Sequence, residues 1–218
     1  MVKDRSSFPT AAPFLPPIPT LPNLRDAARR CQGCNLYLRA TQTVFGEGAR
    51  NASVMLVGEQ PGDKEDMAGR PFIGPAGKIL AEALARAGIA RSEVYLTNAV
   101  KHFSWGPDQR GKRRIHKKPR YSEVQACRPW LDAEIQALHP KVIVCLGSTA
   151  AQLLLGKKFS VLRRRGVSVP SDLAPFVMAT VHPSSILRAQ ADRGEQMQAF
   201  IRDLSVAAKQ IHKVSSAA

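Results

Sequence analysis

The stretch that most constrains the fold of this chain is Gly58–Gly77 (GEQPGDKEDMAGRPFIGPAG), because of what stands on either side of it. Ser53–Val57 before it is an apolar run typical of a short buried strand. In Lys78–Ala87 after it, apolar residues recur at the spacing of one helix face, and Gly88 follows as a stop signal. This polar loop is therefore predicted to leave the carboxyl end of a strand, where open α/β sheets bind their ligands.

Three further strand–helix pairs follow the same plan. The predicted strands after Ser53–Val57 are Glu93–Asn98, Lys141–Leu146 and Phe176–Thr180. The other predicted helices are Asn23–Arg30, a helix from Ser122 with its buried face reaching Leu138, Ala150–Leu155 and Glu195–Ile211. Alternating strands and helices form a parallel sheet covered on both faces. We therefore predict one three-layer α/β/α domain with a central four-stranded parallel sheet.

Two segments are expected to stand outside this pattern. The six prolines of Phe8–Pro22 forbid a signal-peptide helix, so residues 1–22 are predicted to form an extended or disordered arm, before a domain at 23–213 and a short tail at 214–218. His102–Arg120 has no periodicity and is interpreted as one long functional loop. Since no apolar run reaches the length of a membrane span, we expect a cytoplasmic monomer with no membrane partner.

The charge of the chain points to a polyanionic partner. Its 32 Lys and Arg residues outnumber its 17 Asp and Glu residues, for a net charge of +15 and a pI near 10.3. The excess is clustered: Lys101–Arg120 holds eight basic residues and one acid, and Lys157–Arg165 holds five and none. Nucleic acid is favoured over an anionic membrane or a generally basic surface.

Three polar residues follow predicted strands and are candidates for a site at one edge of the sheet: Glu59, Asn98 and His182. Each also has an ordinary structural interpretation, as a solvated carboxylate, an Asx turn and a structural histidine. The glycines of the first loop lack the spacing of a nucleotide-binding P-loop. Backbone N–H groups near Gly74 and Gly77, at the start of a helix, remain candidates for holding a phosphate.

Four cysteines in a protein expected to be cytosolic indicate a metal site or catalysis before disulfides. Cys31 and Cys34 form a C-x2-C pair, whereas seventeen residues separate Cys127 from Cys145. This spacing leaves zinc, an iron–sulfur cluster and plain core cysteines open.

Taken in order, these landmarks resemble the uracil-DNA glycosylase superfamily, specifically family 4 and its UdgX offshoot, over roughly Cys31–Ile211. The segments that carry the likeness are CQGC at 31–34, the Gly58–Gly77 loop, the strand ending at Asn98, GKRRIH at 111–116, Cys127, Cys145, and HPSS at 182–185. The resemblance implies removal of uracil from DNA. It also implies a [4Fe–4S] cluster on Cys31, Cys34, Cys127 and Cys145, with a structural role.

The resemblance also assigns roles within the site. Glu59 would orient or activate the nucleophile, and Gln60 and Asp63 would lie beside the sugar and base. Phe72 would stack on uracil, and Asn98 would bond the uracil edge, where O4 accepts and N3–H donates. His182 of the HPSS motif would donate to uracil O2, and Ser184 of the same motif is a candidate for contact with uracil or DNA.

The basic segment at 111–119 (GKRRIHKKP) resembles the insertion that marks the UdgX group. There a histidine attacks the sugar carbon after base loss, and the matching residue in this chain is His116, with Arg113 and Arg114 as candidates for DNA contact and loop positioning. We therefore predict uracil excision followed by covalent capture on DNA, with single-stranded DNA favoured over double-stranded DNA because no pairing opposes base flipping. The alternatives are a hydrolytic glycosylase of many turnovers, in which His116 is a bystander in a phosphate-gripping loop, and a non-catalytic iron–sulfur DNA-binding protein.

Overall fold

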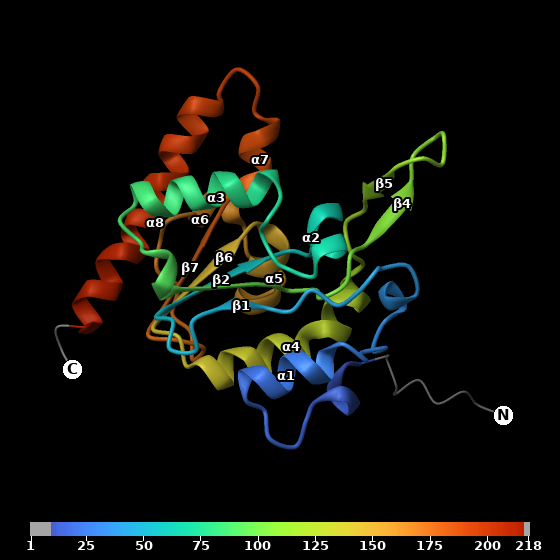
Figure 1. Ribbon diagram of the computed structural model, residues 1–218. Helices are drawn as coiled ribbons and strands as arrows, with labels where there is room; N and C mark the ends of the chain where they lie inside the picture. The colour runs from blue at the N-terminus through green and yellow to red at the C-terminus, as the bar shows by residue number, and fades with distance from the viewer. Residues whose placement is uncertain (1–9, 216–218) are drawn as a thin grey trace.

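The structure, a computed structural model, describes residues 10–215 and forms a central sheet between two layers of helices (Figure 1). The five strands of the sheet stand in the order β1–β3–β2–β6–β7. Their bounds are Glu47–Gly48 (β1), Val54–Gly58 (β2), Val94–Asn98 (β3), Val142–Leu146 (β6) and Phe176–Thr180 (β7). The four predicted strands are parallel, as expected, and the short β1 adds an antiparallel edge beside β3.

The two faces of the sheet follow from the alternation of side chains along each strand. Met55 and Val57 of β2 pack with α1, α4 and α5, whereas Val54 and Leu56 pack with α3, α7 and α8. The helices are α1 (Leu21–Ala28), α3 (Pro75–Arg86), α4 (Tyr121–Leu138), α5 (Ser148–Leu155), α7 (Pro183–Arg188) and α8 (Arg193–Ser215). Both faces are thus covered, which confirms the predicted three layers.

The strand order reverses at β2, and this reversal opens a crevice at the carboxyl end of the sheet. From β2 the chain moves to β3 on one side, and it later returns through β6 on the other side. The loops after β2 and β6 therefore part at the top of the sheet, where ligands bind in open α/β folds. Gly58 and Asn98 are register partners at this edge, so the residues after them are neighbours.

Several elements differ from the sequence-based expectation. The supposed loop at 102–120 contains an antiparallel hairpin of β4 (Trp105–Pro107) and β5 (Arg114–His116), which projects from the domain (Figure 1). Its strands are too short to give a periodic pattern in the sequence. The chain also has three short helices that were not predicted: α2 (Asp63–Ala68) inside the first loop, α6 (Val161–Arg164), and α7 directly after β7. It has 3-10 turns at Ala12–Phe14, Asn35–Leu38 and Arg91–Glu93 as well.

Helix α4 begins differently from the prediction and runs straight through a proline. The cap is Arg120, whose backbone N–H donates to Glu123 Oε2 at 2.7 Å, so the helix begins before the expected Ser122. Pro129 lies inside the helix, which continues to Leu138.

Part of the proline-rich segment packs on the domain. Ala11 is buried, and its N–H donates to the carbonyl of Ala126 at 2.7 Å. A methyl group at Gly33 would lie 2.7 Å from the Ala11 backbone, so the C-x2-C turn needs this glycine. The segment around Ala11 is therefore anchored to α4 and to the first cysteine pair. Residues 1–9, and residues 216–218 of the predicted tail, lie outside the described part of the chain, whereas α8 extends to Ser215.

Candidate functional site

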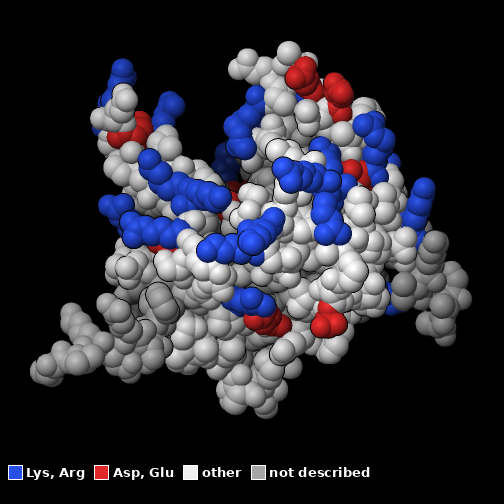
Figure 2. Space-filling model, turned by 180° about the vertical axis from the view of Figure 1, so that it is seen from behind, with Lys and Arg blue, Asp and Glu red and all other residues white. Residues whose placement is uncertain are grey.

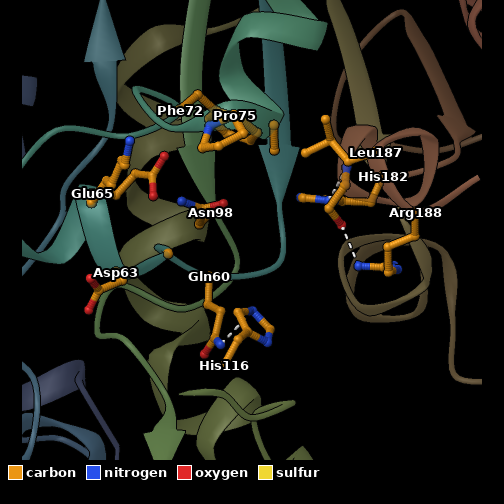
Figure 3. Close-up of a pocket in the computed structure, with 14 residues that line it drawn as sticks. Gln60, Asp63, Glu65, Phe72, Pro75, Asn98, His116, His182, Leu187 and Arg188 are labelled. Carbon is orange, nitrogen blue, oxygen red and sulfur yellow. Dashed lines mark hydrogen bonds between the residues drawn. The ribbon is translucent and has the colours of Figure 1, made fainter. Parts of the chain in front are cut away.

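A two-lobed cavity lies at the carboxyl edge of the sheet, beneath the hairpin. The first lobe measures about 490 Å³, and its lining includes Asn98, Phe72 and Asp63 (Figure 3). The second, of about 290 Å³, is lined by Glu59, Lys118 and the start of α5. The residues common to both lobes are Gln60, His116, His182, Ser184 and Arg188. The structure thus brings the predicted residues of three separate loops to one cavity.

Asn98 presents an unused hydrogen-bond acceptor in the first lobe. Its side chain is 2% exposed, and its Oδ1 has no partner. A buried amide oxygen without a partner is costly, so a ligand with an N–H group in this position would satisfy it. Gly58 makes room for the amide, because a Cβ at Gly58 would lie 2.3 Å from Asn98 Oδ1.

Phe72 forms an aromatic wall of the same lobe and has a strained backbone. Its φ of 56° is unusual for a residue with a side chain, and such conformations persist where the surroundings enforce them. Gly77 of α3 permits this conformation to pack closely, since a Cβ there would lie 1.7 Å from the Phe72 carbonyl oxygen. The ring faces His182 at 6.3 Å between centroids.

His182 is held as a neutral imidazole of defined tautomer. Its Nδ1 accepts from the backbone N–H of Ser184 at 3.2 Å, with Ser184 Oγ 2.8 Å away, because His182 caps α7. Burial, with smaller effects of His116 and Arg188, lowers the pKa of His182 to about 4. The proton therefore sits on Nε2, where it can donate to a ligand oxygen.

His116 ends β5 and is half exposed at the junction of the two lobes. Its Nε2 lies 3.7 Å from Glu59 Oε1, while the hydroxyl of Thr149 donates a short hydrogen bond to Glu59 Oε2. Burial lowers the pKa of His116, Glu59 raises it, and Arg188 lowers it, with a net lowering. The imidazole is thus neutral near pH 7, with Glu59 held beside it.

Gln60 ties the hairpin to the sheet instead of facing the cavity freely. Its Oε1 accepts from Ser104 N–H at 2.9 Å, which fixes the orientation of the amide. Its Nε2 lies 2.8 Å from His116 Nε2, 3.0 Å from the Lys117 carbonyl and 3.2 Å from the Ser104 carbonyl. Since an amide has only two hydrogens for three acceptors, the contact with His116 can be released when a ligand arrives.

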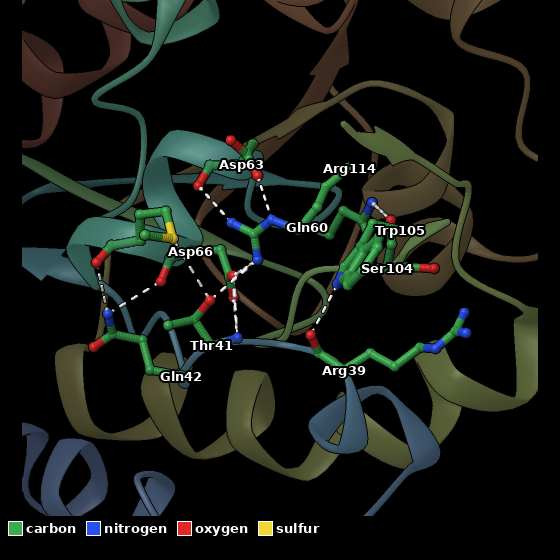
Figure 4. A network of polar contacts seen from close by, with 10 residues as sticks. Arg39, Thr41, Gln42, Gln60, Asp63, Asp66, Ser104, Trp105 and Arg114 are labelled. Atoms are coloured by element: carbon green, nitrogen blue, oxygen red, sulfur yellow. Dashed lines mark hydrogen bonds and ion pairs between the residues drawn. The ribbon is translucent and has the colours of Figure 1, made fainter. Parts of the chain in front are cut away.

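Arg114, predicted to contact DNA, clamps the hairpin onto α2 (Figure 4). Its Nε lies 2.6 Å from Asp63 Oδ1 and its Nη1 lies 2.6 Å from the fully buried Asp66. The guanidinium also lies over the rings of Phe103 and Trp105. Asp63 lines the cavity, but its carboxylate is bound to Arg114. Arg113, by contrast, is exposed near the hairpin tip and is open to a phosphate.

The first loop does not offer the phosphate-binding N–H group expected at Gly74. That N–H donates to Glu65 Oε1 at 2.7 Å. Glu65 is buried on α2, a helix that the sequence did not reveal, so the contact was hidden from sequence analysis.

A buried polar network beneath the site was also missed. Lys101 and Glu134 are both fully buried and form an ion pair. Lys101 Nζ also donates to the Asn98 carbonyl at 2.8 Å, while Tyr95 and Thr97 donate to Glu134 at 3.0 Å. The sequence offers little that would predict this pair. Glu134 lies among apolar residues of α4, and Lys101 follows Asn98 by three positions.

Three of the four cysteines lie together. The pKa of Cys127 is raised to about 12, mainly by burial, with Cys34 and Cys31 close enough to add to the shift. Cys31 Sγ accepts from Trp130 Nε1 at 3.2 Å, and Cys127 Sγ accepts from Lys101 N–H at 3.3 Å, as cluster thiolates do. Burial alone raises the pKa of Cys145 to about 12. Among the described residues, no three His, Cys, Asp or Glu side chains stand in metal-binding positions, so the fit to a four-thiolate cluster is partial.

The outer surface around the cavity is strongly basic. Figure 2 shows Lys and Arg gathered on both sides of a hollow between the hairpin and α7. Arg188 and Lys118 line this hollow itself.

In the part of the chain that the structure describes, no helix is long and apolar enough to cross a membrane.

Residues 45–205 match the uracil DNA glycosylase superfamily, and the chain belongs to that superfamily. The site agrees with this class, since an unpaired amide oxygen and a histidine that caps a helix line one pocket. Within the superfamily, the chain is similar to the type-4 uracil-DNA glycosylase of Thermotoga maritima, with 36% identity over 86% of this chain and 93% of the relative. The type-4 enzyme of Pyrobaculum aerophilum is 37% identical over 85% and 92%, and that of Archaeoglobus fulgidus 36% identical over 72% and 78%.

Proposed function

We propose that this protein excises uracil from DNA and is then captured on the abasic sugar through His116. The observation that carries this proposal is the position of His116 Nε2. His116 lines both lobes of the cavity, its Nε2 lies 3.7 Å from Glu59 Oε1, and the pKa of its imidazole is lowered. The similarity to type-4 uracil-DNA glycosylases supports the excision step, and the capture step rests on the residues of this chain.

Excision begins with uracil flipped into the first lobe. Phe72 stacks on the base, and Asn98 Oδ1, otherwise unpaired, accepts the uracil N3–H. The C1′–N1 bond breaks with its electron pair going to uracil, and His182 Nε2–H donates to O2, where negative charge develops. A neutral histidine suffices for this task, because its tautomer is fixed by Ser184.

Capture follows at the sugar carbon. The oxocarbenium ion at C1′ would stand beside both the Glu59 carboxylate and the Nε2 lone pair of His116, and both favour a cation there. The lone pair forms the C1′–Nε2 bond, the Nδ1 proton is lost to solvent, and the uracil anion takes a proton from solvent. The products are neutral uracil and an imidazole bonded to the sugar. Single-stranded DNA is the favoured substrate, since flipping there breaks no base pair.

A denaturing gel tests the proposal directly. A uracil-containing single-stranded oligonucleotide should give a shifted band that survives heat and detergent, with one protein for each DNA. A thymine-containing oligonucleotide and the His116→Ala variant should give none. If the wild-type protein instead yields many alkali-labile sites and no shifted band, capture is contradicted.

Hydrolysis with many turnovers is the second candidate, and one contact favours it. Glu59 is held by Thr149 inside the second lobe, where a water molecule would fit. Under that mechanism His116→Ala would leave turnover unchanged. A DNA-binding protein without catalytic activity would leave uracil in place in both forms, and its affinity would depend steeply on salt without preferring uracil.

We also propose that Cys31, Cys34, Cys127 and Cys145 hold a [4Fe–4S] cluster with a structural role, fixing the turn at Gly33 against α4. The three adjacent thiols and the two N–H donors to sulfur support it. Anaerobically purified protein should contain about four iron and four sulfide per chain. Cys127→Ser should lose both, and an iron-free soluble protein would contradict the assignment.

A further inference from the structure

We propose that the exposed ends of α4 and α5 form a second DNA contact surface, here called the Tyr121–Lys157 shelf, made of Lys118, Tyr121, Lys157 and Lys158. It would bind the single strand on one side of the flipped nucleotide. This inference rests on the proposed function, because the strand must enter the cavity at His116. It adds a stacking site and a path for the strand as it leaves the cavity.

The shelf is continuous with the cavity. Lys118 lines the second lobe together with Glu59 and His116, and Tyr121 begins α4 three residues later. Helix α5 begins at Ser148 in the same lobe and ends at Leu155, two residues before Lys157. Because a helix rises 1.5 Å per residue, the shelf ends about 12 Å from the lobe. That distance suits a few nucleotides of one strand.

Tyr121 has the properties of a stacking platform. Its side chain is 61% exposed at the start of a helix, although large aromatic residues usually bury their rings. Lys157 Nζ lies 5.1 Å from the centre of the ring. An exposed cation–π contact is weak, so a base can take the place of the ammonium, which then becomes free to pair with a phosphate.

The lysines of the shelf have no acidic partner, unlike several other cations of the described residues. Arg70, Arg86 and Arg128 each form an ion pair with a neighbouring carboxylate. Within the described residues, Lys118, Lys157 and Lys158 form none, and all three are exposed. An unpaired basic surface with an exposed aromatic ring is the combination that binds single-stranded nucleic acid. Figure 2 shows that the hollow is bordered by Lys and Arg on both sides, which favours a polyanion that passes through it.

The test uses uracil-free single-stranded oligonucleotides, so that affinity is measured without any reaction. Tyr121→Ala should weaken binding at least about fivefold, and Tyr121→Phe, which keeps the ring, should not. Lys157→Ala should lower the slope of log affinity against log salt by about 0.7. The matched control is Lys209→Ala, which removes one exposed cation from α8 on the opposite face of the sheet and should change affinity little.

A second experiment tests which flank of the uracil lies on the shelf. It starts from a uracil oligonucleotide with a single nucleotide on each side of the uracil, and each flank is then lengthened separately. Lengthening one flank should raise the affinity or cross-linking rate of the wild-type protein, and Tyr121→Ala should remove that gain. Unchanged affinity in Tyr121→Ala, or equal losses in Lys157→Ala and Lys209→Ala, would overturn the shelf. Absence of cross-linking with normal shelf behaviour would instead overturn only the proposed function.

Discussion

The two histidines of the cavity differ in how the fold holds them. His182 stands at the junction of β7 and α7, where a backbone N–H fixes its tautomer and burial lowers its pKa to about 4. His116 stands on a projecting hairpin and is half exposed, and its ring is held mainly by the side chain of Gln60. The hydrogen-bond donor His182 is thus held by the central sheet and its helix, whereas the proposed nucleophile His116 lies on a separate hairpin.

This difference predicts that excision and capture can be separated by mutation, with the largest effects at the two histidines. His182→Ala should slow uracil release by about 10²–10³, the usual loss on removing one donor to a developing anion. The fraction of released uracil that ends in a cross-link should stay unchanged. His116→Ala should reduce that fraction to zero. Both quantities follow from one time course of free uracil and shifted DNA, and equal losses of both in His182→Ala would contradict the separation.

Gln60→Ala removes the tie between the hairpin and the sheet. Because it deletes the contact that orients His116 and the bonds to the Ser104 and Lys117 backbone, capture should slow by about tenfold. Uracil release should fall less, since Asn98 and His182 stand on other elements. Single-turnover rates of both steps would measure the ratio, and a larger loss in release would show that Gln60 acts on the base.

Lowering the pH should weaken capture by His116 before it affects uracil release, which depends on His182. Capture needs the unprotonated Nε2 of His116, whose pKa lies below the ordinary value of 6.5, so the cross-linked fraction should fall as pH drops through that pKa. His182 stays neutral down to a pH of about 4. Cross-links per uracil released, measured from pH 8 to pH 4.5, should therefore decline at the acid end, and a flat ratio would exclude His116 as the titrating group.

The smallest effects are expected at the two neighbouring arginines. Arg114→Ala breaks the clamp to Asp63 and leaves Asp66 buried without its cation, which should cost about 1–3 kcal/mol of stability and slow capture several-fold. Arg113→Ala should leave stability unchanged and lower the salt slope of DNA binding by about 0.7. Thermal unfolding and salt titrations distinguish them, and an equal loss of stability in both variants would contradict the clamp.

Much of this fold was predictable because its signals are local. The four parallel strands followed from apolar runs, and so did the edge of the sheet at which their polar loops meet. Asn98 ends its strand and His182 follows its strand, as expected. The hairpin was not predicted, because three-residue strands carry no period and its stability comes from Arg114 and Gln60. The buried pair Lys101–Glu134 was equally hidden, because the two residues meet only across the sheet and α4.

The sequence by itself determined the α/β class, the edge at which polar residues gather and the basic charge that favours nucleic acid. Only the tertiary structure decided which of these residues are free to act. Arg114 and Asp63 neutralise one another, Gly74 is occupied by Glu65, and Asn98 keeps an unpaired oxygen. The physical reason is that hydrogen-bonding capacity is finite, and whether a polar group is already satisfied depends on partners that come from distant parts of the chain.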